Sequence, residues 1–245
     1  MVSTLITNSE SQAAHGGGKS RRGRLRTVAA ALLFAAGLLL LSEVVVTLVW
    51  QEPITALHAR REQSELNEKL RKAEAQTLAA PAGFEAGREF KPNRVAFAAL
   101  AYGRRTADGE PLGRIEIPEL GARFVFVEGV SANDLARGPG HYSGTPLPGE
   151  PGTVGIAGHR TTYLAPFRHI DELKRDDQIV LRMPYGIFRY RVEGSSVVSP
   201  TDTASLRRVG HDRLALTTCT PPFSAAKRLV VNARLSSTVL LRRHR

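Results

Sequence analysis

Cysteine is nearly absent from this chain of 245 residues, in which Cys219 is the only one. A single thiol excludes a framework of disulfides within the chain. Three alternatives remain for it: a buried inert side chain, a bridge to another molecule, or a reactive group. Because unpaired cysteine is among the most frequently buried residue types, composition alone favours the inert thiol.

Acidic residues are also in the minority, with 23 Asp and Glu against 34 Lys and Arg, for a net charge of +11. The excess is spread along the chain without the aromatic and basic pattern of nucleic-acid-binding modules, so no nucleic-acid partner is expected. Carboxylates do not cluster as metal ligands would, and the acidic pairs at 171–172 and 176–177 are interpreted as solvated charges. We therefore predict neither a metal nor a cofactor.

One long hydrophobic run is present near the N-terminus. Val28 to Trp50 is almost wholly apolar and long enough to cross about 30 Å of hydrocarbon as a helix. The basic segment Lys19–Arg26 precedes it, which favours a cytoplasmic tail over residues 1–27 and an outward-facing remainder. A cleaved signal peptide is the alternative, but its apolar part is normally only about 7–15 residues long. We expect a single-pass transmembrane helix over residues 28–50 and a location in the cell membrane.

The next segment, residues 51–109, is predicted to be a juxtamembrane helix and linker arm. Leucines recur at loose helical spacing from Pro53 to about Ala80, which predicts a helix or stalk. A Pro-Ala-Gly sequence then breaks that helix. Residues 81–109 are expected to form an arm packed on the domain that follows.

From about residue 110 the pattern changes to short β-type runs separated by glycine and proline. Seven or eight short strands with few helices predict an all-β barrel or sandwich over residues 110–238, followed by a basic tail over 239–245. Short helices are expected at 131–137, 167–173 and 202–208, with Ser131 and Asp202 as N-caps. The predicted strands are Arg114–Ile117, Arg123–Val127, Thr153–Ala157, Gln178–Met183, Phe188–Val198, Leu214–Thr218 and Arg228–Leu235.

Three reactive side-chain types stand at the ends of predicted strands. Cys219 closes the run LALTTC, His159 closes VGIAGH, and Arg228 opens RLVVNARL. Together they would supply a nucleophile, an acid–base group and an oxyanion stabiliser. Each also has an ordinary interpretation, as a buried thiol, a hydrogen-bonding surface imidazole and a solvated guanidinium.

The local motifs resemble those of the sortase family. LTTC at 216–219, followed by Arg228 nine residues on, resembles the signature T-L-x-T-C with an Arg on the next strand. AGHR at 157–160 resembles the family's histidine motif, the stretch from Gly138 to Arg160 resembles the segment leading to it, and RIEIP at 114–118 resembles the first-strand element I-x-I-P. The resemblance covers about residues 110–236. Ala215 departs from it, because the motif has a threonine there.

The resemblance implies a sortase-like eight-stranded β-barrel with short helices, preceded by the transmembrane helix. It also implies a cysteine transpeptidase in which Cys219 attacks a sorting signal of the L-P-x-T-G or L-A-x-T-G kind, His159 protonates the leaving amine, and Arg228 stabilises the oxyanion. Partners would be surface proteins bearing the signal and an amine of a peptidoglycan precursor or a pilin. The detailed pattern is most similar to class E sortases.

Three further residues are candidate substrate contacts by their place near these motifs: Thr218, His141 and Tyr142. His141 and Tyr142 would either line the substrate groove or pack the loop before His159. The alternatives for the whole chain are a non-catalytic binding domain on the same barrel, a thiol hydrolase, and an envelope scaffold acting through the helix at 53–80.

Overall fold

The computed structural model describes residues 21–49, 53–79 and 92–241. The chain divides into two compact units at Val45–Val46. Helix α1 (Arg21–Val49) makes up the described part of the first unit and reaches a few residues into the second. Its large apolar side chains, Leu33 and Leu39 among them, are exposed, and Leu25–Val46 is long and apolar enough to cross a membrane. The helix therefore fits the predicted membrane anchor.

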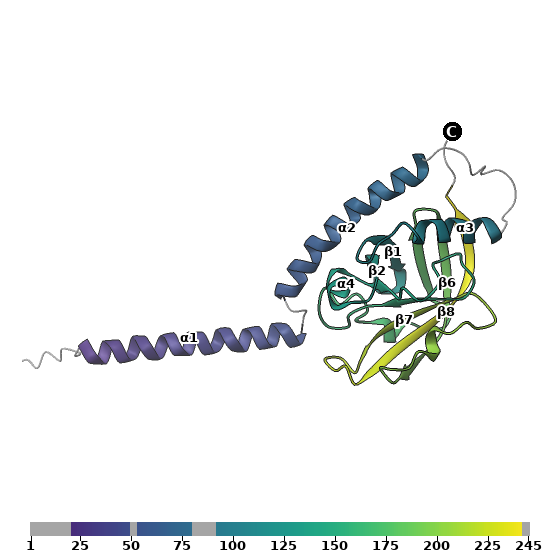
Figure 1. Cartoon of the computed structure of the whole chain (residues 1–245). Coiled ribbons are helices and arrows are strands. Elements are labelled where there is room, and N and C mark those ends of the chain that lie inside the picture. Colours follow the sequence, from purple (N-terminus) through teal and green to yellow (C-terminus); the bar gives the residue numbers. More distant parts are fainter. Residues whose placement is uncertain (1–20, 50–52, 80–91, 242–245) are drawn as a thin grey trace, which may run out of the picture. The chain divides into compact units, whose positions relative to one another are not determined.

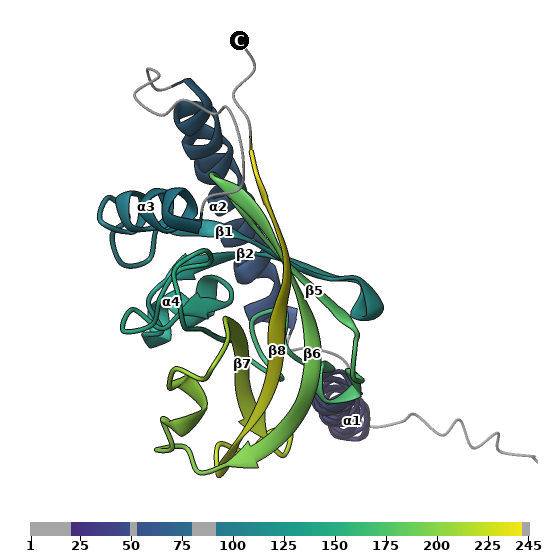
Figure 2. The same ribbon diagram turned by 90° about the vertical axis from the view of Figure 1, so that its right-hand side faces the viewer.

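The second unit is built on a closed barrel of eight strands (Figures 1 and 2), which confirms the predicted fold class. The strands follow the order β1-β2-β3-β4-β7-β8-β6-β5, and β5 pairs with β1 to close the ring. The pairings are antiparallel except β2–β3 and β4–β7, which are parallel. The strands are β1 (Pro111–Ile117), β2 (Ala122–Glu128), β3 (Gly140–His141), β4 (Thr153–Ala157), β5 (Gln178–Met183), β6 (Gly186–Val198), β7 (Arg213–Thr220) and β8 (Lys227–Leu240).

Alternating apolar residues fill the interior of the barrel. Since successive side chains of a strand point to opposite faces, Leu214 and Leu216 of β7 lie in the core beside Leu229 and Val231 of β8. The seven predicted strands are present, but β3 escaped prediction because two residues are too few to show a period.

Two helices pack against the barrel. Figure 1 shows α2 (Pro53–Ala79) alongside β1 and β2, where Leu66 and Leu70 are fully buried with Val125 and Val127. The amide of Gln63 donates to the Val125 carbonyl at 2.9 Å and accepts from its N–H at 2.8 Å, so it continues the hydrogen bonding of β2 outward. The predicted juxtamembrane helix is thus bound to the domain along its length and does not stand away from it as a stalk.

Helix α3 (Pro92–Gly103) lies within the segment that was expected to form an arm packed on the domain, with no helix assigned to it. It inserts Val95 and Ala99 into the barrel core. The rest of the predicted arm between the two helices, residues 80–91, lies outside the described residues. Apolar side chains four residues apart explain why this short segment is helical, since they form one face that the core can bury.

The remaining helices are short. In α4 (Ala132–Arg137), Ser131 is the predicted N-cap and forms a capping box with Asp134. The other two expected helices are single 3₁₀ turns, η2 (Ile170–Glu172) and η3 (Ala204–Leu206), and a third turn, η1 (Pro118–Leu120), joins β1 to β2. Asp202 does not occupy the N-cap position of η3, but its carboxylate accepts the Ala204 N–H at 2.7 Å.

Candidate functional site

Strand register sets two of the three predicted reactive residues beside each other and brings the segment before the third close to them. In the parallel pair β4–β7, Ala157 lies opposite Thr217, and the N–H of Gly158 continues the pairing by donating to the Thr217 carbonyl at 3.0 Å. His159 is the next residue, in the loop after β4, and Cys219 lies two residues beyond Thr217 on β7. On the other side of β7, Cys219 lies directly opposite Arg228 of β8. We call these three residues the site row.

The site row belongs to the outer face of the barrel. Leu216 of β7 points into the core. Because successive side chains of a strand alternate, Ala215, Thr217 and Cys219 point to the opposite, outer face. Thr217 and Ala215 are buried, whereas Cys219 at the strand end is only partly buried. The thiol is therefore reachable from outside, which removes the main argument for an inert cysteine.

His159 is half-buried at the start of the loop after β4. Its ring contacts the ring of Tyr163, with centroids 5.0 Å apart, and burial lowers the pKa of the imidazole below its ordinary value of 6.5. Neither ring nitrogen has a hydrogen bond within the described part of the chain. The lowered pKa favours the neutral form of the imidazole, in which one nitrogen carries a proton and the other can accept one.

The loop that carries His159 is held tightly. Three consecutive residues, Tyr163 to Ala165, have positive φ angles, between 43° and 65°, which non-glycine residues rarely adopt. The His159 carbonyl accepts the Phe167 N–H at 3.1 Å, and Gly158 has no room for a side chain because the Phe167 ring would lie 2.5 Å from a Cβ there. Such strain is retained when surrounding contacts enforce it, and here those contacts fix the backbone of the loop that carries His159.

Arg228 keeps most of its donors available. Nη1 donates to the carbonyls of Ala225 at 3.1 Å and Lys227 at 3.2 Å, and the guanidinium has no carboxylate partner in the described part of the chain. A guanidinium has five N–H donors, so the others remain for an incoming anion or carbonyl oxygen. Its charge beside Cys219 favours a thiolate or an oxyanion in the site row.

Sequence reasoning did not identify Arg160, which lies directly after His159 inside the AGHR motif. Its side chain is 6% exposed, and Nη1 donates to the Thr220 hydroxyl at 2.9 Å and to the Cys219 carbonyl at 3.5 Å. Nη2 forms an ion pair with Asp171 at 2.7 Å. This carboxylate is exposed, as expected of a solvated charge, and also has an arginine partner. A buried arginine therefore ties the end of β7 to the histidine loop and sets the position of the thiol.

The three predicted substrate contacts have different surroundings. The Thr218 hydroxyl is buried and donates to the Gly158 carbonyl at 2.7 Å, on the opposite face of β7 from the thiol. His141 is 2% exposed, with Nδ1 2.9 Å from Glu128 and Nε2 3.0 Å from the Thr145 hydroxyl. This geometry favours supporting roles for both. Tyr142 is half-buried on the outer face, where its hydroxyl is 2.9 Å from that of Thr217, and its contact with substrate remains a prediction.

The arrangement fits acyl transfer to and from a thiol. A partly exposed thiol, an imidazole and a guanidinium with donors to spare are side-chain types that covalent catalysis at a carbonyl can use. Within the described residues no three His, Cys, Asp or Glu side chains group as metal ligands would. Fold and site together define a class of protein, a β-barrel that presents a cysteine nucleophile at one strand end.

Comparison with known proteins agrees with this class. The family model for the Sortase domain matches residues 115–236. Sortase D of Bacillus subtilis is 39% identical over 129 residues, and Sortase SrtE1 of Streptomyces coelicolor is 34% identical over 139 residues. The crystal structure of Sortase E1 from Streptomyces coelicolor, which has a tripeptide in its active site, matches with a TM-score of 0.52 and 31% identity, over 55% of this chain and 93% of that one. The chain belongs to the sortase family, whose members are cysteine transpeptidases.

The chain spans only part of the length of these two curated relatives. Each of the two curated relatives matches 50% of this chain, which covers 63% of the length of Sortase D and 40% of that of SrtE1. The relatives include both a sortase D and a sortase E.

Proposed function

We propose that this chain is a membrane-anchored cysteine transpeptidase of the class E type, which cleaves a sorting signal between Thr and Gly and passes the acyl group to an amine. The observation that supports the proposal is the register that sets Cys219 of β7 directly opposite Arg228 of β8, together with the Gly158 hydrogen bond that ties the segment before His159 to β7. The tripeptide in the active site of the related Sortase E1 supports a peptide as the substrate here.

In the first half of the reaction the Cys219 thiol gives its proton to His159, and the sulfur attacks the threonine carbonyl carbon of the signal. The resulting oxyanion is stabilised by N–H donors of Arg228. The carbon–nitrogen bond then breaks, and the glycine nitrogen leaves as an amine with a proton from His159. The product is a thioester between Cys219 and the N-terminal part of the substrate.

In the second half an amine attacks the thioester carbonyl. His159 accepts a proton from that amine, the carbon–sulfur bond breaks, and Cys219 returns as the thiolate. Because thiol and imidazole exchange one proton through the cycle, their protonation belongs to the pair and not to either residue. Arg160 takes part only by holding the backbone of Cys219 and Thr220.

The substrate would be an L-P-x-T-G-like or L-A-x-T-G-like segment of a surface protein, and the acceptor an amine of the cell wall or of a pilin. The apolar run in α1 would anchor the chain with its barrel outside the cell. A protease-accessibility assay on intact cells tests this orientation, since a barrel protected from added protease would contradict it.

The activity test uses the full chain in detergent, incubated with each peptide in the presence and absence of an amine. We expect an amine-dependent ligation product and a mass-spectrometric adduct on Cys219. Cys219→Ala should form neither, whereas His169→Ala, which alters an exposed imidazole outside the site row, should behave as wild type. Equal behaviour of wild type and Cys219→Ala would refute catalysis and favour a binding domain. Cleavage without ligation would favour a thiol hydrolase.

A further inference from the structure

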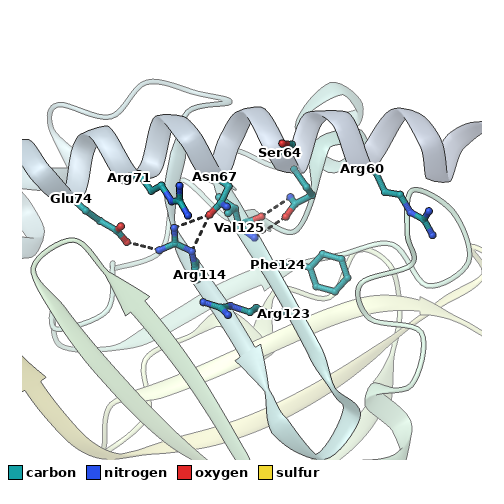
Figure 3. A pocket seen from close by; sticks show the side chains of 10 residues that line it. Arg60, Ser64, Asn67, Arg71, Glu74, Arg114, Arg123, Phe124 and Val125 are labelled. Carbon is teal, nitrogen blue, oxygen red and sulfur yellow. Dashed lines mark hydrogen bonds and ion pairs between the residues drawn. The ribbon is translucent and has the colours of Figure 1, made fainter.

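A groove of about 660 Å³ lies between α2 and the strands β1 and β2, far along the barrel wall from the site row. Figure 3 shows that one flank of α2 supplies its upper wall and that side chains from both strands form its floor. The spacing of the α2 residues is helical, so they form a polar stripe beside the buried stripe of Leu66 and Leu70. The lining residues are Arg60, Gln63, Ser64, Asn67, Arg71, Glu74, Arg114, Arg123, Phe124 and Val125.

The groove is strongly basic, with four guanidiniums and one carboxylate in its lining. Two of the guanidiniums are already bound: Arg114 pairs with Glu74 and also donates to Asn67 at 2.7 Å, and Arg123 pairs with Glu116 at 3.3 Å. The carboxylate of Glu74 is therefore already paired, with Arg114. The groove therefore has uncompensated positive charge.

The two remaining arginines, Arg60 and Arg71, are exposed on the α2 flank (Figure 3). Neither has a hydrogen bond or an ion pair within the described part of the chain. Arginine binds phosphate oxygens through paired N–H donors, so these are the positions where a phosphate group would be held.

The distance between these two arginines indicates which kind of anion the groove would bind. Arg60 and Arg71 are eleven residues apart, about 16 Å along a helix, which one phosphate cannot bridge. A surface that offers many phosphates can satisfy both. Helix α1 ends at Val49 and α2 begins at Pro53, so only a short link separates them. The residues of the groove that lie on α2 are therefore close in sequence to the proposed membrane span.

We propose that the groove along α2 binds the phosphate headgroups of anionic lipids and so docks the barrel against the membrane surface. Arg60 and Arg71 are the contacting residues, and Arg114 and Arg123 supply the background charge. Such docking would hold the barrel in one orientation at the membrane, whatever reaction the site row performs. The inference rests on the proposed anchor but not on the proposed activity.

The test uses the full chain carrying Cys219→Ala and Ser64→Cys, so that a fluorophore attached at position 64 is the only label and lies in the groove. The protein is placed in nanodiscs of phosphatidylcholine with or without phosphatidylglycerol. We expect protection of the fluorophore from an aqueous quencher only with phosphatidylglycerol, and its loss at about 1 M salt, where the screening length falls to ~3 Å.

Arg60→Glu with Arg71→Glu should shift the docking equilibrium by at least about 30-fold toward the undocked state. Arg61→Glu with Lys72→Glu is the matched control, because these neighbouring exposed positions on α2 carry the same charge change and do not line the groove. Arg60→Gln with Arg71→Gln, a milder change, should give a smaller shift in the same direction. Unchanged thermal unfolding of each variant confirms that the fold is kept.

Other outcomes overturn the proposal. Protection that is equal in neutral discs, or equally lost in both pairs of charge-reversal variants, would show that the groove does not recognise lipid phosphate. Protection produced in neutral discs by soluble inorganic polyphosphate alone would assign the groove to a free polyanion. Failure of the chain to remain with neutral discs would instead refute the anchor, and is seen separately as loss of protein from the disc fraction.

Discussion

Polar side chains on the two sides of strand β4 differ in whether they have hydrogen-bond partners. On the β3 side, His141 is enclosed with Glu128 and Thr145, and both its ring nitrogens have partners. On the β7–β8 side, the His159 nitrogens have no hydrogen bond, and Arg160 Nε and Asn232 Oδ1 are buried with no partner within the described residues. Buried polar groups are normally paired, so unpaired ones indicate a place where something other than stability was selected. The first histidine therefore maintains the fold, and the second is available for chemistry.

His159→Ala should give the largest effect on activity. Loss of the acid–base group lowers kcat/KM about 10²–10⁴-fold, whereas the free energy of unfolding changes by less than about 1 kcal/mol because no hydrogen bond is lost. Peptide ligation and thermal denaturation measure the two quantities. His141→Ala serves as the contrasting variant, and a similar loss of activity per folded molecule in both would remove the distinction between the two histidines.

His141→Ala should instead lower the free energy of unfolding by about 3 kcal/mol, since the largely buried Glu128 carboxylate loses its partner. Burial acts to raise the pKa of Glu128, but the His141 hydrogen bond and charge hold it below the ordinary 4.5. A lowered folded-state pKa stabilises the protein above that pH, and the contribution is lost as pH falls through the folded pKa.

Chemical denaturation between neutral and acid pH tests this. Wild type should lose the Glu128 contribution as pH falls below 4.5, while the variant keeps only the part that comes from the Ser143 hydrogen bond and should show a flatter profile. Glu128→Gln in the His141→Ala background should recover part of the stability, because no charge is then left buried. Identical pH profiles for wild type and His141→Ala would contradict the assignment.

Arg160→Met should reduce kcat about 10-fold with little change in KM, because the end of β7 and its thiol lose their tether while substrate contacts stay. Arg160→Lys keeps the charge but cannot contact Thr220 and Asp171 with a planar fork, so it should restore only part of the rate. Steady-state kinetics separate the two parameters. Full rescue by lysine would show that charge alone matters and that the geometry of the tether does not.

Ala215→Thr should have the smallest effect, a gain of about 1 kcal/mol in the free energy of unfolding. Ala215 is fully buried and lies directly opposite Asn232, whose Oδ1 has no partner in the described part of the chain. The threonine that the family motif has at this position would bring a hydroxyl donor to that oxygen. Ala215→Val adds a similar volume without the hydroxyl, so equal stability of the two variants would exclude the hydrogen bond.

Much of this molecule could be predicted from its amino-acid sequence, and the misses have physical causes. Strand runs with period-two alternation were recognisable, and so was the apolar run of α1. Strand β3 was missed because it pairs over only two residues. The helix α2 was expected, as a juxtamembrane helix or stalk, but its packing on the barrel was not, because its buried stripe of small and leucine residues is interrupted by charges. Arg160 was missed because a single arginine carries no sign of burial until its partner Asp171, eleven residues on, is brought beside it.

By itself the sequence determined the anchor-like helix, the all-β domain and the motifs that contain Cys219, His159 and Arg228, because these depend on composition and on patterns along the chain. Only the tertiary structure decided which strands are neighbours, and hence that Cys219 lies opposite Arg228. That depends on the register of β7 with β8, and a one-residue slip would have turned the thiol and the guanidinium to opposite faces. Likewise, only packing separated the two histidines, since identical side chains acquire different chemistry from the partners that the fold places around them.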